Sequence, residues 1–287
     1  MKSYKEELIE KMKTSNTAHI VEGEELLRLQ KVLFNIYKDV EAVCKKHHLT
    51  CMLIGGSALG AIRHKGFIPW DDDLDMAMPR KDYEIFKDIF VNELGEKYVL
   101  NSPNYSNKPT NRFPKVLKRN TKFVEVDSID DDRACIKIDI FIIENVPNNI
   151  FKRLIKGLRC TAYMFAGGHV LSYEESMEQH KKMHKRELIG KMLSFWSSTK
   201  WFNRFDKVCR YNDEESEFVG IPSGRNHYFR EIVSREVLLP VVQGAFEGEK
   251  VFLPADADAY LRNLYGDYMM IPPEEKREKH YIEKIEF

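Results

Sequence analysis

The sequence predicts an α+β fold, in which a mixed β-sheet flanked by helices is followed by a mainly helical second half. Up to Pro147, short apolar runs that end at Gly or Pro alternate with amphipathic helical patterns. After Pro147 the spacing of Lys, Met and Leu becomes helical. We therefore expect a core over residues 1–147, with an N-terminal helix. A helical region and a C-terminal segment over 148–287 would complete the site, and the two parts could form one continuous domain.

The first expected elements are a long helix and a buried strand. Over Glu22–His48 apolar residues recur at three- and four-residue steps, which indicates one buried helix stripe. Cys51–Ile54 is a short apolar run, typical of a buried strand, and it leads into Gly55-Gly56. Ser57 is then placed to cap a short helix over 58–63. The stripe of the long helix consists of Leu26, Leu29, Leu33, Tyr37, Val40 and Cys44.

A second strand and helix follow, and then further strands. Leu74–Met78 reads as a strand that Pro79 ends. A helix is then expected from Pro79 to about Leu94. Proline is tolerated at its first position, because the backbone N–H that proline lacks would have no partner there. Leucine and β-branched runs predict strands at 98–100, 115–118, 121–126 and 136–142.

The second half is expected to be helical at first. Helical spacing covers Ile150–Arg159 and Glu174–Ser197. Residues 245–253 indicate a strand pair or a sheet edge. A short helix over Asp256–Tyr265 should end at Gly266, which is a good residue for closing a helix.

Composition excludes several classes of protein. Lys and Arg number 45, as do Asp and Glu, so the formal net charge is zero. This argues against a nucleic-acid binder, which usually carries a basic surplus. Residues 1–13 lack the apolar segment of a signal peptide, and no stretch is apolar enough to span a membrane. The five scattered cysteines have no metal-site spacing, so we expect reduced thiols in a cytoplasmic protein.

The densest chemical signal is the acidic run at Asp71-Asp72-Asp73-Leu74-Asp75. Carboxylates packed this closely repel one another unless a cation neutralises them, and their hard oxygen ligands suit Mg²⁺, with Mn²⁺ as a possible substitute. Because side chains alternate along a strand, Asp73 and Asp75 should share one face while Leu74 points into the core. The alternative is a solvated acidic loop.

A solitary acid also stands inside the apolar run Ile136–Phe141. There the isoleucines should face one way, whereas Lys137, Asp139 and Phe141 face the other. A carboxylate in mid-strand is disfavoured by propensity and desolvation, which indicates a function. A salt bridge from Asp139 to a Lys or Arg of a neighbouring strand is the alternative.

Gly55-Gly56-Ser57 lies where the first strand meets a helix. Glycines let the backbone approach a ligand closely, and amides at a helix start bind phosphate oxygens. Arg63 and Lys65 follow in the same connection and could hold phosphate charge. The alternatives are an ordinary glycine turn and an exposed basic turn.

Together, the strand, glycine turn, short helix, Asp-x-Asp strand and later Asp resemble the nucleotidyltransferase superfamily fold. The run from Gly55 to Asp75 (GGSALGAIRHKGFIPWDDDLD) more specifically resembles the LicD family of phosphocholine transferases, which are related to the fukutin-type transferases. The resemblance recurs at Asp139-Ile140-Phe141 and in C-terminal segments up to His280. Ile142 and Glu144 stand where the family often has Pro and a later Asp.

This resemblance implies transfer of a phospho-alcohol from a CDP-activated donor, most often CDP-choline, to a hydroxyl of a glycan or lipid-linked glycan precursor. Such acceptors are of the teichoic acid, lipopolysaccharide or capsule type. It implies that Asp73, Asp75 and Asp139 are the catalytic and metal-binding residues, with Asp139 either completing the metal site or accepting the proton of the attacking hydroxyl. The donor phosphates would contact Gly55, Gly56 and Ser57, together with Arg63 or Lys65.

A choline headgroup is a quaternary ammonium, which aromatic faces attract. Trp70, next to the acidic run, is the first candidate for this contact, and Tyr265 and Tyr268 are the next. Ordinary packing is the alternative for each.

Basic residues of the second half suggest a peripheral contact with the inner face of a membrane. His180 and His184 lie among lysines, and Lys152, Arg153, Lys156 and Arg159 could join them on an anionic lipid surface. The alternatives are a solvated basic helix face and zinc binding by the two histidines, although no acid stands at ligand spacing for zinc.

Two other functions remain open from the sequence. The same fold could transfer a nucleotide such as AMP onto a small molecule or protein, in which case ATP rather than a CDP-alcohol would be the donor. A non-catalytic module that binds carbohydrate or lipid intermediates would not need Asp73, Asp75 and Asp139 together.

Overall fold

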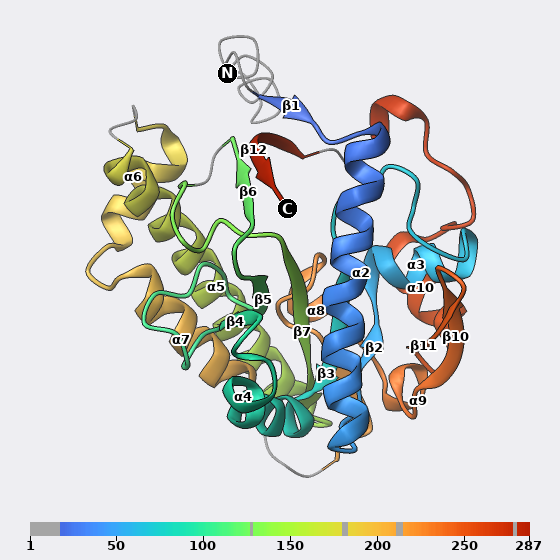
Figure 1. Cartoon of the computed structure of the whole chain (residues 1–287). Helices are drawn as coiled ribbons and strands as arrows, with labels where there is room; N and C mark the ends of the chain where they lie inside the picture. The colour runs from blue at the N-terminus through green and yellow to red at the C-terminus, as the bar shows by residue number, and fades with distance from the viewer. Residues whose placement is uncertain (1–17, 127–128, 180–182, 211–214, 278–279) are drawn as a thin grey trace.

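A mixed sheet at the centre of the molecule, flanked by helices, confirms the α+β fold class (Figure 1). The computed structural model describes residues 18–126, 129–179, 183–210, 215–277 and 280–287. Strands β3 and β7 are parallel, and the other pairs of this sheet are antiparallel. The path of the sheet is β2 (Met52–Leu53), β3 (Asp75–Pro79), β7 (Lys137–Val146), β5 (Lys115–Lys118) and β4 (Tyr98–Asn101); β8 (Phe218–Gly220) pairs with β7, and β9 (Ile232–Ser234) with β8.

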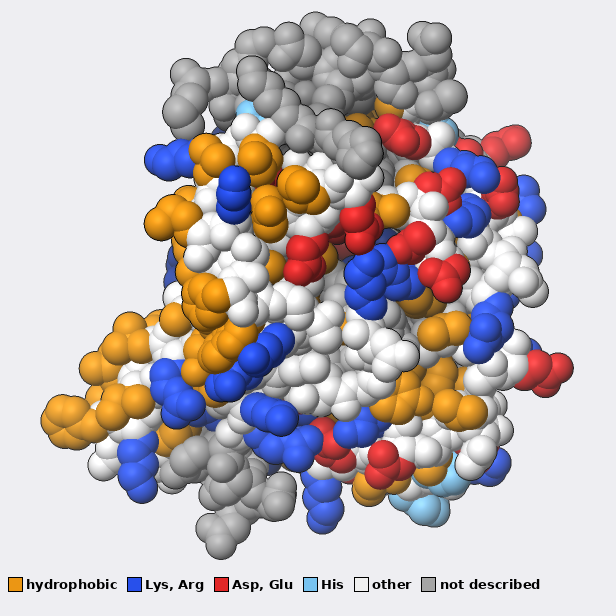
Figure 2. All heavy atoms as spheres, turned by 90° about the vertical axis from the view of Figure 1, so that its left-hand side faces the viewer, with side chains coloured by type: hydrophobic (Ala, Val, Ile, Leu, Met, Phe, Trp, Pro, Cys, Tyr) orange, Lys and Arg blue, Asp and Glu red, His pale blue; other side chains and the backbone are white. Residues whose placement is uncertain are grey.

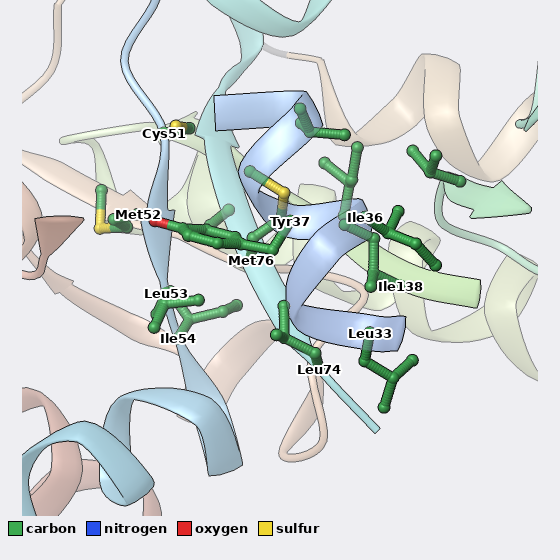
Figure 3. Packing of buried hydrophobic residues seen from close by; sticks show 14 of the residues in the cluster. Leu33, Ile36, Tyr37, Cys51, Met52, Leu53, Ile54, Leu74, Met76 and Ile138 are labelled. Carbon is green, nitrogen blue, oxygen red and sulfur yellow. The ribbon is translucent and has the colours of Figure 1, made fainter. Parts of the chain in front are cut away.

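The predicted long helix forms α2 (Gly23–Lys46), which crosses one face of the sheet (Figure 1). Its apolar stripe is buried as expected, and Leu33, Ile36 and Tyr37 are at most 1% exposed. Figure 3 shows these side chains beside Leu74 and Met76 and their neighbours. Burial of this stripe fixes the helix against the strands that carry the acidic residues.

Two shorter helices complete the predicted first half. Helix α3 (Gly55–Arg63) directly follows β2, and α4 (Arg80–Leu94) directly follows β3, with Pro79 as its N-terminal cap. All the strands expected between residues 98 and 142 are present, but β7 continues to Val146 because its far end pairs with β8.

The helices of the second half differ from the prediction. Helix α5 (Ile150–Glu178) continues past Arg159, where the helical spacing in the sequence was expected to end. Its glycines are points of close packing. A Cβ at Gly157 would lie 2.3 Å from Phe229, and one at Gly167 would lie 2.7 Å from Phe202. The aromatic rings of neighbouring elements therefore contact the α5 backbone closely.

The single helix expected over Glu174–Ser197 is wrong. Helix α5 ends at Glu178, α6 (Lys185–Leu193) is a separate helix, and α7 (Ser198–Cys209) was not predicted. The start of α6 is specified locally, since the Glu187 carboxylate accepts a hydrogen bond from the backbone N–H of His184. His180 lies outside the described residues, so zinc binding by His180 and His184 stays a prediction.

Strands also occur in the second half, so its helical assignment is correct only up to about Cys209. The predicted strand pair exists as β10 (Val242–Phe246) and β11 (Glu249–Leu253). Helix α10 (Ala257–Tyr265) ends at Gly266, whose φ of +69° is favourable for glycine. A further sheet joins β1 (His19–Ile20), β12 (Tyr281–Glu286) and β6 (Lys122–Glu125). The remaining short helices are α8 (His227–Arg230), α9 (Arg235–Leu238) and η1 (Glu274–Lys276).

The cysteines are buried free thiols, as the sequence suggested. Among the described residues, the helices are too short or too polar for any of them to cross a lipid bilayer.

Candidate active site

Strand pairing brings together acids that are far apart in the sequence. In the parallel ladder of β3 and β7, Asp75 lies directly opposite Asp139. On the other side of β7, Asp139 lies opposite Lys115 of β5. Direct partners in a sheet project from the same face, so Asp75, Asp139 and Lys115 form a row across three strands.

The alternation predicted for β7 is confirmed. Ile138 and Ile140 are fully buried, whereas Lys137 and Phe141 remain partly exposed on the opposite face with Asp139. The backbone N–H of Asp139 donates to the carbonyl of Leu74 at 3.1 Å. This hydrogen bond fixes the register of Asp139 relative to the acidic run.

The carboxylate of Asp139 lacks a full complement of partners. Its Oδ1 is buried without a hydrogen bond within the described part of the chain, and the nearest cation is Lys115, with Nζ–Oδ1 3.6 Å. The salt bridge offered as the alternative therefore exists only as a contact longer than a hydrogen bond. Burial lowers the pKa of Lys115, which weakens this compensation further.

The acids around Asp75 repel one another. Burial, followed by the negative charges of Asp73, Asp139 and Asp71, raises the pKa of Asp75 well above its usual value. Hard carboxylate oxygens whose charges repel one another fit Mg²⁺ or Mn²⁺, and Oδ1 of Asp139, which accepts no hydrogen bond within the described residues, is an available ligand atom. Over the residues that the structure describes, no three His, Cys, Asp or Glu side chains already stand in metal-site geometry. Holding an ion would therefore require the carboxylates to rotate toward one another.

The glycine turn packs directly against these carboxylates. Gly55 has φ +54°, and a Cβ there would lie 2.9 Å from Oδ2 of Asp75. A Cβ on Gly56 would lie 3.1 Å from Oδ2 of Asp71. Glycine is thus required at position 55 both for backbone conformation and for space.

Ser57 does not cap α3, contrary to the prediction. The helix begins at Gly55 with Ile54 as its N-terminal cap, because glycine can enter the turn at positive φ. The buried Oγ of Ser57 instead accepts a hydrogen bond from the backbone N–H of Asp75 at 2.8 Å. Ser57 therefore positions the first residue of β3 rather than the helix.

Gly55→Ala is expected to lower turnover more than tenfold, because the added methyl group displaces the Asp75 carboxylate and strains the backbone. Gly23→Ala is the matched control: Gly23 also has positive φ, +62°, but a Cβ there meets nothing within 4 Å. Both variants should lose about 1 kcal/mol of stability from backbone strain. Steady-state rates and urea unfolding of the two variants measure this, and equal activity in both would contradict the contact's importance.

Two adjoining hollows meet at the acidic run. We call the first the glycine pocket; its lining includes Gly55, Gly56, Asp75 and the later residues Tyr260 and Tyr265. We call the second the lysine pocket; its lining includes Lys115, Lys137 and Asp139. Both are lined by Asp72, Asp73 and His280. The proposed metal ligands therefore lie at the junction, with room for a substrate on either side.

Five predicted site residues line neither pocket: Ser57, Arg63, Lys65, Trp70 and Tyr268. The Arg63 guanidinium donates to the backbone carbonyl of Tyr268, and Lys65 is an exposed residue in a turn. One face of the Trp70 ring is covered by the guanidinium of Arg277, 4.0 Å from the ring centroid. The hydroxyl of Tyr268 donates to Asp258 at 2.7 Å.

Several residues at the pockets were missed in the sequence. Arg225 and Glu231 line the glycine pocket, and neither belongs to a motif that the sequence would single out. His280 lies at the end of the C-terminal segments that resemble the LicD family, and this resemblance was the only sign in the sequence that His280 belongs to the site. Its ring Nδ1 lies 2.6 Å from Oδ1 of Asp72, and this hydrogen bond raises the pKa of His280 to about 9. At neutral pH a protonated His280 therefore offsets one charge of the acidic run.

The comparisons with known proteins agree with the resemblance in the sequence. Residues 48–159 match the family model described as LicD/FKTN/FKRP, nucleotidyltransferase domain. The chain is 27% identical to the lipopolysaccharide cholinephosphotransferase LicD of Haemophilus influenzae over 259 residues, which is 89% of this chain and 95% of that protein. A shorter match, 37% identical over 57 residues, covers 20% of this chain and 18% of an uncharacterized protein of Rickettsia typhi.

Proposed function

Since the chain belongs to the LicD family, we propose that it is a phosphocholine transferase. In this proposal CDP-choline is the donor, and the acceptor is a hydroxyl of a cell-surface glycan precursor of the lipopolysaccharide, teichoic acid or capsule type. The observation that carries the proposal is the pairing of Asp75 with Asp139 beside the Gly55-Gly56 turn. The same arrangement supports a nucleotidyltransferase-like core, because it unites a strand, a glycine turn, a helix and three acids.

The residues of the site have separate tasks in this reaction. An acceptor hydroxyl oxygen attacks the phosphorus that carries the choline, the bond from that phosphorus to CMP breaks, and CMP leaves with the electron pair. Asp139, whose Oδ1 accepts no hydrogen bond within the described residues, accepts the proton of the hydroxyl or serves as a metal ligand. Asp73, Asp75 and Asp139 would hold Mg²⁺, which when bound neutralises charge on the diphosphate.

Donor phosphate contacts are reassigned by the geometry. Gly55 and Gly56 begin α3 in the glycine pocket, where their small size lets phosphate oxygens approach the amides at the helix start. The N–H of Gly55 donates to the Tyr260 hydroxyl at 3.2 Å, so a phosphate oxygen would replace that hydroxyl or bind the Gly56 amide. Arg225 lines the same pocket, whereas Arg63 and Lys65 do not. We therefore propose Arg225 as the cationic contact of the donor in place of the two earlier candidates.

A donor screen tests the proposal. CDP-choline with Mg²⁺ should raise the melting temperature, since a ligand at 100 times its Kd stabilises by about 2.7 kcal/mol. Phosphorus NMR should then detect CMP when an acceptor is added. Stabilisation by ATP without any effect of CDP-alcohols would instead favour nucleotide transfer, and no effect of either would favour a non-catalytic binding module.

The proposal includes a peripheral membrane contact through α5, since a lipid-linked acceptor would lie at the bilayer surface. Phe151, Ile155 and Leu158 are 73%, 59% and 58% exposed, and they recur at helical spacing on one face. No acidic residue occurs between positions 150 and 173. Figure 2, viewed from the side that carries α5, α6 and α7, shows hydrophobic side chains along one edge, interrupted by Lys and Arg.

The basic residues of this surface are fewer than the sequence suggested. Lys152 and Arg159 are exposed, but Lys156 is buried and donates to the backbone carbonyl of Asn145. Arg153 is partly buried and donates to the carbonyl of Pro147. The remaining positive charge still repels a second copy of the same surface and favours an anionic lipid.

Flotation with vesicles tests this contact. The full chain should bind vesicles that contain phosphatidylglycerol, and the double variant Phe151→Ser/Ile155→Ser should lose most of that binding. Leu27→Ser is the control, because Leu27 is 66% exposed on a different helix. Equal flotation of the double variant and the control would remove α5 as the membrane surface.

A further inference from the structure

Glu231 is a buried acid that faces the glycine pocket. It lies between α8 and β9, is 5% exposed, and lines the pocket together with Gly55 and Asp75. Its Oε1 accepts a hydrogen bond from the backbone N–H of Asn226 at 2.9 Å. Neither the reaction chemistry nor the metal ligands proposed above use this carboxylate.

The carboxylate of Glu231 has no cationic partner in the part of the chain that the structure describes. Within the described residues, no Lys, Arg or His forms an ion pair with Glu231. Burial accordingly raises its pKa to about 7. Buried carboxylates are normally paired, so an unpaired one that lines a substrate pocket indicates that the missing cation arrives with a ligand.

The surrounding side chains suit one kind of cation. Tyr260 and Tyr265 line the same pocket as Glu231, and Phe141 and Leu264 add apolar surface. The hydroxyl of Tyr260 is engaged by the backbone N–H of Gly55 at 3.2 Å. Aromatic and apolar walls suit a quaternary ammonium, which has no N–H to donate and binds through its charge and methyl groups.

We propose that Glu231, together with Tyr260 and Tyr265, forms the subsite for the quaternary ammonium headgroup of the donor. This inference rests on the proposed function, which places the donor diphosphate at Gly55 and Gly56. The hydrogen bond from Gly55 to Tyr260 connects the two parts of the pocket directly. The headgroup thus binds at Glu231, rather than at Trp70 or Tyr268, which line neither pocket.

The subsite also provides a basis for choosing among donors. A buried carboxylate attracts a cation strongly, because the local dielectric is low, but gains no such attraction from a neutral glycerol or ribitol group. Glu231 therefore favours CDP-choline over CDP-glycerol, although both carry the same nucleotide.

Calorimetric titration with CDP-choline, CDP-glycerol and CDP tests the inference. Wild-type protein should bind CDP-choline at least about tenfold more tightly than CDP-glycerol. Glu231→Gln retains an acceptor for the Asn226 N–H but removes the charge, so it should weaken CDP-choline binding about tenfold or more and change CDP-glycerol binding less than about twofold. Two variants of Tyr265 test the subsite independently, in case Glu231→Gln does not fold. Tyr265→Leu should lose the preference for CDP-choline, and Tyr265→Phe should keep it.

The possible failures are distinguishable. If wild-type protein binds all three compounds but shows no preference for CDP-choline, the headgroup subsite is wrong and the cytidine donor stands. Equal losses of CDP-choline and CDP-glycerol in Glu231→Gln would likewise overturn the subsite, since they would indicate a purely structural role. Failure of wild-type protein to bind any cytidine compound would overturn the proposed function itself.

Discussion

Asp75→Asn is expected to reduce turnover by at least about 100-fold, the loss typical when one preorganised group that stabilises the transition state is removed. Asp75 lies opposite Asp139 and against Gly55, so its carboxylate is at the junction of the two pockets. Asn retains nearly the same volume and one oxygen, but it loses the charge that an ion requires. Initial rates with CDP-choline and an acceptor measure the loss.

The same substitution should raise stability when no divalent ion is present. The raised pKa of Asp75 means that the ionised form is less favourable in the folded chain than in the unfolded chain. Wild-type stability therefore falls as pH rises above the ordinary Asp pKa of about 4 toward the higher native value. Asp75→Asn lacks this fall, so its advantage in melting temperature should widen as pH rises.

Asp258→Asn is the matched control for both effects. Asp258 is exposed, and its hydrogen bonds from Arg262 and Tyr268 lower its pKa. Removing its charge should leave turnover intact and should slightly lower stability. Near-normal turnover of Asp75→Asn, or a melting temperature below that of the wild-type protein across the pH range, would contradict the role assigned to Asp75.

Arg80→Met is expected to destabilise the fold by about 3–5 kcal/mol, the usual cost of leaving one partner of a buried ion pair alone. The Arg80 guanidinium bonds Glu144 of β7, with Nε–Oε1 3.0 Å, and Asp206 of α7, with Nη2–Oδ1 2.7 Å. Glu144 is only 2% exposed. Removing Arg80 would leave that carboxylate buried without its cation, and urea unfolding measures the cost.

Arg210 provides a control on the same network. It contacts Glu84, as Arg80 does, but its side chain is 47% exposed. Arg210→Met should therefore cost at most about 1 kcal/mol. The double variant Arg80→Met/Glu144→Met should recover part of the loss, because the most deeply buried of the carboxylates that Arg80 pairs with is then also removed. Equal losses of unfolding free energy in Arg80→Met and Arg210→Met would contradict a larger contribution of the buried ion pair to stability.

Local sequence patterns predicted the face on which each acid lies. Strict alternation across 136–141 placed Asp139 away from the core, and the structure confirms it. The pairing of Asp139 with Asp75 could not be predicted from the local sequence around either residue, because the register of two parallel strands depends on the chain that connects them. The expectation that these acids meet came from the family resemblance.

The errors have physical causes of the same kind. Arg63 is close to the glycine turn in sequence, but α3 places it at the opposite helix end, about 12 Å along the axis from Gly55 at 1.5 Å per residue. The helix expected over Ile150–Arg159 continues to Glu178, since rings of other elements pack closely against its backbone, as Phe229 does at Gly157. Glu231 lies in a segment without periodicity, so only tertiary packing shows that it faces the glycine pocket.

The central claim is that Asp73, Asp75 and Asp139 together hold a divalent ion beside the glycine turn. Calorimetric titration of Mn²⁺ into the wild-type chain with CDP present tests it most directly, alongside Asp75→Asn and Asp258→Asn. We expect saturable binding in the wild-type protein and in Asp258→Asn, and its loss in Asp75→Asn. Identical Mn²⁺ binding in all three proteins, or none in the wild-type protein, would contradict the claim.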